Sequence, residues 1–147
     1  SGQLRADWLQ CTSIAASVKP DTDEEPGRYS FEEIADAAME CVRAGGLGRA
    51  LLGPRLLQVF YPTSSEERMR FLDAAIAADD MAIFREMRQQ KSGDYYLLYG
   101  CEERCRLYTY FIKKEFGADI TVESIYEKDQ LAQLTVDGVI AIAQAYL

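Results

Sequence analysis

Four cysteines, at positions 11, 41, 101 and 105 of this 147-residue chain, are the side chains with the widest choice of chemistry. Cys101 and Cys105 stand four residues apart, so on a helix they share one face, with Cα atoms about 6 Å apart. That separation is at the long end of what a disulfide tolerates. Arg104 and Arg106 flank the two cysteines and are expected to lower the pKa of a thiol over which they lean.

Three interpretations of the cysteines are open. Cys41, Cys101 and Cys105 fall on apolar stripes of predicted helices, where a free thiol acts as a small hydrophobic side chain. Two disulfides are expected instead if the protein is exported, and four cysteines allow three pairings. A redox or metal site at Cys101 and Cys105 is the third. We favour free thiols and slightly favour a cytoplasmic location, and keep the thiol site as an alternative function.

Tyrosines are concentrated between residues 94 and 111, where they offer a large contact area with few rotatable bonds. We predict one helix over about 94–116, closed by Gly117, and take Tyr95, Tyr96 and Tyr99 as candidate partner-binding residues. Ordinary core packing is the simpler explanation of the same pattern. A tyrosine-lined ligand pocket beside the two neighbouring cysteines is a further hypothesis.

Acidic residues are segregated along the chain, whose net charge is −8. Residues 21–42 hold eight acids against one arginine, divided between an expected acidic loop at 19–29 and the helix after it. On that helix we take four acids as a candidate surface that steers a basic partner, namely Glu32, Glu33, Asp36 and Glu40. A solvated helix face that keeps the protein soluble is the simpler alternative.

The residue types that are missing exclude several functions. The chain has no histidine, which removes Ser-His-Asp and Cys-His catalytic units and His-containing zinc sites. We therefore expect no enzymatic activity, no metal and no cofactor. The acidic balance argues against nucleic-acid binding, and no apolar run is long enough to span a bilayer. The start at Ser1-Gly2 without a methionine is expected of a fragment of a longer chain.

Several elements must position these residues. A short helix is expected around Trp8, and capping-box spacings begin helices at Ser30 and Ser64. Gly45-Gly46 is expected to end the first of these, and a helix follows from Pro54. The helix over about 65–91 is expected to break at Asp79-Asp80.

The last third is predicted to hold a short strand at Ile120–Tyr126. A helix at 139–147 capped by Thr135 follows, and a hairpin at Asp137-Gly138 is its competitor. Leu51, Leu52, Leu56, Leu57 and Val59-Phe60 leave enough apolar surface for a homodimer as well as a monomer.

Together these patterns predict a mainly α, compact helical domain of five or six helices, with a short strand or hairpin in the last third. We expect one domain over 1–147. The predicted function is a non-enzymatic protein-binding module that docks a basic partner through the acidic segment or the tyrosine-rich helix. The alternatives are the thiol-dependent protein and a helical domain that binds a small ligand.

Overall fold

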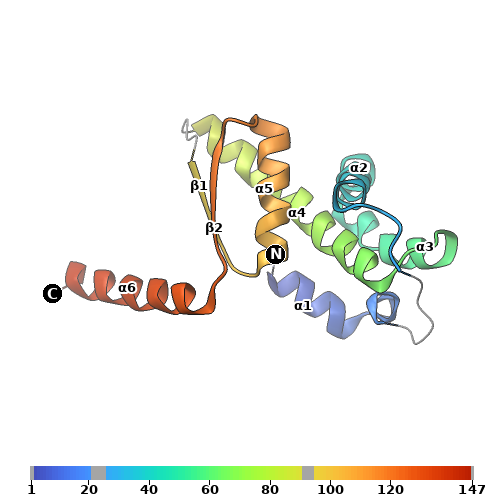
Figure 1. Ribbon diagram of the computed structural model, residues 1–147, viewed down its shortest axis with the longest axis horizontal. Helices are drawn as coiled ribbons and strands as arrows, with labels where there is room; N and C mark the ends of the chain where they lie inside the picture. The colour runs from blue at the N-terminus through green and yellow to red at the C-terminus, as the bar shows by residue number, and fades with distance from the viewer. Residues whose placement is uncertain (1, 21–25, 91–94, 147) are drawn as a thin grey trace. The chain divides into compact units, whose positions relative to one another are not determined.

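Two serine–glutamate capping boxes set where the two longest helices of the first two thirds begin. In the computed structural model the Ser30 hydroxyl accepts from the backbone N–H of Glu33, and the Glu33 carboxylate accepts from the backbone N–H of Ser30 at 2.8 Å. Ser64 and Glu67 form the same reciprocal pair. Helices α2 (Phe31–Ala50) and α4 (Ser65–Gln90) follow, as predicted (Figure 1).

The structure describes residues 2–20, 26–90 and 95–146. The expected acidic loop at 19–29 therefore lies only partly within the described residues. The chain is mainly helical, at 76%, which confirms the predicted fold class. It divides into two compact units, Ser1–Lys91 and Ser92–Leu147. The expectation of a single domain over 1–147 stays a prediction, because a compact unit is not in itself an independently folding domain.

Shorter helices complete the first unit. Helix α1 (Gly2–Cys11) leads into the 3₁₀ helix η1 (Ser13–Val18), and α3 (Gly53–Phe60) has a proline in its first turn. Both α1 and α3 were predicted, the latter from Pro54, whose fixed φ suits the start of a helix. Gly46 breaks the regular backbone of α2 with φ 75° and ψ 169°, after which one further helical turn leads to Ala50.

Helix α4 is the central element of the first unit. It runs unbroken through Asp79-Asp80, so the predicted break there is wrong. Neither aspartate removes a backbone donor or needs a left-handed backbone, and the helix continues at only a small cost in propensity. All eight residues of 71–78 are buried, and α2, α3 and η1 pack on α4. Trp8, Val18 and Leu72 belong to the core that ties α1 and η1 to this helix.

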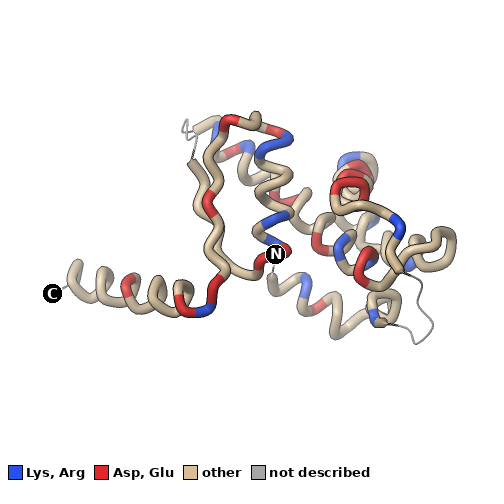
Figure 2. Tube along the Cα trace, in the orientation of Figure 1, with Lys and Arg blue, Asp and Glu red and all other residues tan. Residues whose placement is uncertain are grey.

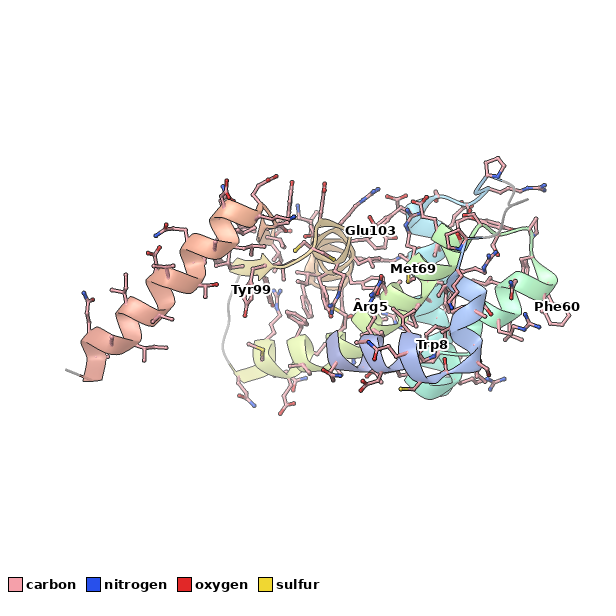
Figure 3. All side chains as sticks on the ribbon, turned by 90° about the horizontal axis from the view of Figure 1, so that it is seen from below. Arg5, Trp8, Phe60, Met69, Tyr99 and Glu103 are labelled. Carbon is pink, nitrogen blue, oxygen red and sulfur yellow. The ribbon has the colours of Figure 1, made fainter. Side chains whose placement is uncertain are left out.

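Charged side chains also anchor α1 and the loops to α4. Arg5 pairs with Asp73, and its Nη2 lies 3.4 Å from the sulfur of Met69 (Figure 3). Buried Arg68 donates to the backbone carbonyls of Ser17 and Thr63. A guanidinium with several fixed donors can thus satisfy carbonyl groups from two separate segments at once.

The second unit alternates strands and helices. Its elements are β1 (Tyr95–Tyr99), α5 (Glu102–Phe116), β2 (Thr121–Ile125) and α6 (Lys128–Tyr146). The two strands pair in parallel, with Tyr95 opposite Thr121 and Tyr99 opposite Ile125. Helix α5 is the crossover between them and packs against both strands. The predicted strand near 120–126 is confirmed.

Two predicted boundaries in this unit are wrong. The helix expected over 94–116 begins only at Glu102, because Gly100 adopts φ 143° and separates it from β1. The last helix begins at Lys128 instead of after Thr135, whose hydroxyl donates to the Leu131 carbonyl in the middle of α6 at 3.0 Å. Gly138 also lies within α6, which excludes the hairpin alternative.

Candidate functional site

The tyrosine cluster is divided by a strand and does not form one helical surface. Successive side chains of β1 point to opposite faces, so Tyr95, Leu97 and Tyr99 share one face, and all three are exposed. Tyr96 faces the other way and stacks on Phe116 of α5, with ring centroids 6.2 Å apart. Of the three predicted partner-binding tyrosines, the structure therefore keeps Tyr95 and Tyr99 together and separates Tyr96 from them.

The parallel register adds β2 residues to this outer face. Leu97 lies opposite Glu123, and the Tyr95 hydroxyl donates to the Glu123 carboxylate. This hydrogen bond raises the pKa of the Tyr95 phenol, because it holds the phenolic proton, and the nearby negative charge acts in the same direction. The sequence analysis missed Leu97 and Glu123, since their places on this face follow from the parallel pairing of the strands.

The outer face of β1 and β2 has no helix packed on it within the second unit. Tyr99, at the end of β1, is 75% exposed, and Tyr95 is also exposed. Parallel sheets in proteins are normally covered on both faces, because the crossover helices bury them. Here α5 covers one face only. By the strand register, this uncovered face holds two tyrosines, a leucine, a threonine, an isoleucine and one carboxylate.

Helix α6 carries the largest apolar surface of the second unit. None of its side chains between Lys128 and Ala145 is buried. At 3.6 residues per turn, the polar residues of α6 after Asp129, with the exception of Thr135, fall within roughly 60° of the helix circumference. The rest of the circumference is apolar, and its large exposed side chains are Leu134, Val136, Val139, Ile140 and Ile142.

Figure 2 shows the second half of α6 without charged residues. Asp137 is the last charged residue of the sequence. A helix that is apolar on most sides is normally buried. The sequence analysis recognised an alanine-rich helix here but did not assign it to the site, although the run of uncharged residues after Asp137 was a usable signal.

The predicted acidic surface lies along α2. Glu32, Asp36 and Glu40 recur every four residues, so they form a stripe on one side of the helix, and Glu32 and Glu40 are exposed. Glu33 is also exposed, but its carboxylate accepts the backbone hydrogen bond of the capping box. Glu32 and Glu40 thus lie at the surface and Asp36 is half-buried, whereas Glu33 has a structural role at the start of α2.

All four cysteines are free thiols, as the favoured interpretation had it, but only Cys105 is buried. Cys101 is the N-cap residue of α5 and is exposed, so the two cysteines do not share a buried stripe. Burial raises the pKa of the Cys105 thiol, the neighbouring Cys101 adds to this, and Arg104 opposes it only in part. Arg104 thus acts in the expected direction, but burial outweighs it and the thiol pKa of Cys105 is raised overall.

The apolar segment before and within α3 is largely exposed. Leu52, Leu56, Val59 and Phe60 are exposed, while Leu51 and Leu57 are half-buried. The sequence analysis left open whether this segment is buried within the monomer, and the structure places four of its six named residues at the surface.

Neither a metal-binding cluster nor a membrane-spanning helix is found in the described ranges. Among residues 2–20, 26–90 and 95–146, no three histidine, cysteine or acidic side chains are close enough together to hold a metal ion. No helix within those ranges combines the length and the apolar character needed to cross a bilayer. Comparisons of the chain with protein-family models, with curated proteins and with solved structures find no match.

Proposed function

We propose that this chain is a non-enzymatic module that binds another protein through α6 and the outer face of β1 and β2. The observation that carries the proposal is α6 itself, an apolar helix of 19 residues with no buried side chain between Lys128 and Ala145. Leaving a leucine- or isoleucine-sized side chain in water forgoes about 1.5–3 kcal/mol of transfer free energy. Association that covers several such side chains is correspondingly favourable.

The chemistry of the outer sheet face supports the same proposal. Tyrosine is enriched where proteins bind one another, because it offers a large rigid area and a polar tip. Tyr95 and Tyr99 provide this area beside the aliphatic side chain of Leu97. The hydrogen bond from Tyr95 to Glu123 fixes one ring in place before binding, which lowers the entropy lost on association.

A basic segment on the partner is the third part of the proposal. The stripe of Glu32, Asp36 and Glu40 gives the chain a local negative field, and the net charge of −8 has the same sign. Such a field speeds the encounter with a positively charged partner more than it strengthens the final complex. Salt is therefore expected to slow association and to leave dissociation nearly unchanged.

Affinity purification from the source cells, followed by quantitative mass spectrometry, tests the proposal. The bait is the tagged full chain, and Ile142→Glu places a charge on the apolar side of α6. We expect a small set of proteins to be enriched by the wild type and lost with this variant. Gln144→Glu is the matched control, since it adds the same charge on the polar side of α6 and should keep the partners.

Two results would contradict the proposal. Enrichment of no protein over an untagged control would remove protein binding as the function. Partners that survive Ile142→Glu but are lost when Glu32, Asp36 and Glu40 are changed to glutamine or asparagine would move the docking surface to α2.

A further inference from the structure

Helix α3 presents an apolar stripe to the solvent. At 3.6 residues per turn, Leu56, Val59, Phe60 and the N-cap residue Leu52 fall within roughly 100° of the circumference. All four are exposed, and Phe60 is 72% exposed. Figure 3 shows the Phe60 ring projecting outward from the end of α3. The C-cap residue Tyr61 extends this α3 surface and is exposed as well.

The segment that contains α3 has a charge opposite to that of the whole chain. The 25 residues from Cys41 to Ser65 contain three arginines and no acidic residue, although the net charge of the protein is −8. Arg49 and Arg55 are exposed, and neither makes an ion pair within the described residues. Arg55 borders the apolar stripe and donates to Gln58 at 2.6 Å, which leaves most of its N–H groups available.

The opposite side of α3 is held firmly by α4. Gly53 and Pro54 are buried, and a Cβ atom on Gly53 would come within 2.1 Å of the Phe71 ring. This close approach fixes the start of α3 on α4 and turns the apolar stripe outward. A rigid surface of this kind loses little conformational entropy when it binds.

We propose that the α3 surface is a second binding site, which takes an acidic segment of another protein with an apolar face. In this arrangement the apolar side chains of the segment cover Leu56, Val59 and Phe60. Carboxylates at its edge pair with Arg49 and Arg55, and guanidinium–carboxylate pairs form two parallel hydrogen bonds when geometry allows. The site is separate from α6 and from the acidic stripe, so it stands if the function proposed above fails.

An anionic membrane has similar chemistry but fits the observations less well. A bilayer is an extended plane, so it would meet the field of many charges of a protein whose net charge is −8. A bound segment meets chiefly the charges within a Debye length, about 8 Å at physiological ionic strength. Two arginines also supply only about 2 kcal/mol of attraction to an anionic surface. A local acidic segment is therefore the occupant that we infer.

Fluorescence anisotropy with a labelled synthetic peptide tests this site on the full chain. The probe is an 18-residue helical peptide with leucines at every third and fourth position and glutamates on its other faces. A second peptide carries lysine in place of glutamate. We expect the acidic peptide to bind at the α3 surface, where the basic one does not, and its affinity to fall as salt rises.

Variants locate the peptide on the protein. Phe60→Ser is expected to weaken binding of the acidic peptide about tenfold, as loss of an aromatic anchor typically does. Arg49→Gln combined with Arg55→Gln should weaken binding and also flatten its salt dependence. Ile83→Ser, at an exposed apolar position on α4, and Lys113→Gln on α5 are the matched controls and should leave affinity unchanged.

Each other outcome overturns the site. Equal or tighter binding of the lysine peptide that is lost with Phe60→Ser would exclude an acidic occupant of the α3 surface. An affinity for the acidic peptide that is changed neither by Phe60→Ser nor by the double arginine variant would also exclude this site, if circular dichroism shows that both variants are folded. Binding to phosphatidylserine vesicles without binding to the peptide would assign the surface to lipid. Self-association in sedimentation that is lost with Phe60→Ser, again without peptide binding, would assign it to a second copy of the chain.

Discussion

Glu67 is the acidic residue whose surroundings differ most from those of a solvated carboxylate. It is 2% exposed, and its carboxylate accepts from the backbone N–H groups of Tyr29 at 2.6 Å and Ser64 at 2.7 Å. Burial by itself raises the pKa, but these hydrogen bonds and one from the backbone of Arg28 together lower it below the ordinary value of 4.5. One carboxylate thus joins the segment before α2 to the start of α4.

Glu67→Gln is expected to destabilise the protein by about 1–3 kcal/mol at pH 7, because the amide cannot accept all of these hydrogen bonds. A lowered folded-state pKa means that the stabilisation is complete above the unfolded-state pKa and is lost as pH falls through the folded-state value. The difference between the variant and wild type should therefore be smaller at pH 3 than at pH 7. Urea unfolding at both pH values measures this.

Glu66→Gln is the matched control for Glu67, because its carboxylate is exposed and, among the described residues, pairs with Arg70 along the helix. Exposed pairs of this kind contribute at most about 1 kcal/mol and usually less. If Glu66→Gln destabilised as much as Glu67→Gln, the backbone hydrogen bonds would not be the cause.

The four thiols are expected to react at two distinct rates. Cys11, Cys41 and Cys101 are exposed, whereas Cys105 is buried and its thiol pKa is raised, so it holds a smaller fraction of the reactive thiolate. Alkylation with iodoacetamide at pH 8, followed by mass spectrometry, should show three fast additions and a slow fourth. All four should react quickly in denaturant. Fast labelling of Cys105 in the folded protein would revive the reactive-thiol alternative.

Helix α3 depends on the absence of a side chain at one position. A Cβ atom on Gly53 would meet the Phe71 ring at 2.1 Å, and Phe71 is itself buried. We expect Gly53→Ala to cost about 1–3 kcal/mol, as overpacking in a filled core does. Thermal and urea unfolding measure the cost.

Gly48→Ala is the control for Gly53, since an added Cβ there meets nothing within 4 Å. Its φ is not in the left-handed region, so it should be neutral or stabilising by up to about 1 kcal/mol. Equal destabilisation by both alanines would mean that the contact with Phe71 does not decide the effect, since helix propensity favours alanine over glycine at both positions.

Elements whose signals are local could be predicted from the sequence. The spacing of Ser30 with Glu33 and of Ser64 with Glu67 placed the starts of α2 and α4 correctly, because the capping partners lie three residues apart. Pro54 placed α3 in the same way. In each case the deciding hydrogen bond or dihedral restraint lies within one helical turn.

Elements that depend on distant residues could not be predicted in this way. Tyr95–Tyr99 satisfies a helical and a strand pattern equally well, and its pairing with Thr121–Ile125 across α5 decides for the strand. One of the three predicted partner-binding tyrosines is separated from the other two as a result, because the strand turns Tyr96 toward α5. Thr135 was taken as an N-cap because its residue type suits one, although a threonine within a helix can also bond back to the preceding turn.

At the scale of the whole molecule, the proposed binding surfaces and the stabilising core occupy different elements. The buried residues of the first unit centre on α4, and those of the second on α5, where Phe111 and Ile112 are fully buried. The exposed apolar side chains concentrate on α3, the outer face of β1 and α6. Such a separation allows a binding surface to be changed at little cost to folding.

Removal of α6 tests this separation. A chain that ends at Glu127 loses no buried side chain of the described part of α6, so we expect its free energy of unfolding to change by less than about 1 kcal/mol. The slope of that free energy with urea should also stay constant, since it follows the surface exposed on unfolding. Phe111→Ala, at a fully buried position on α5, should cost about 3–5 kcal/mol in the same experiment.

A truncation that costs as much as Phe111→Ala, with a smaller slope, would mean that α6 packs onto the rest of the chain in solution. Its apolar face would then belong to the core, and the proposed binding function would lose the observation that carries it.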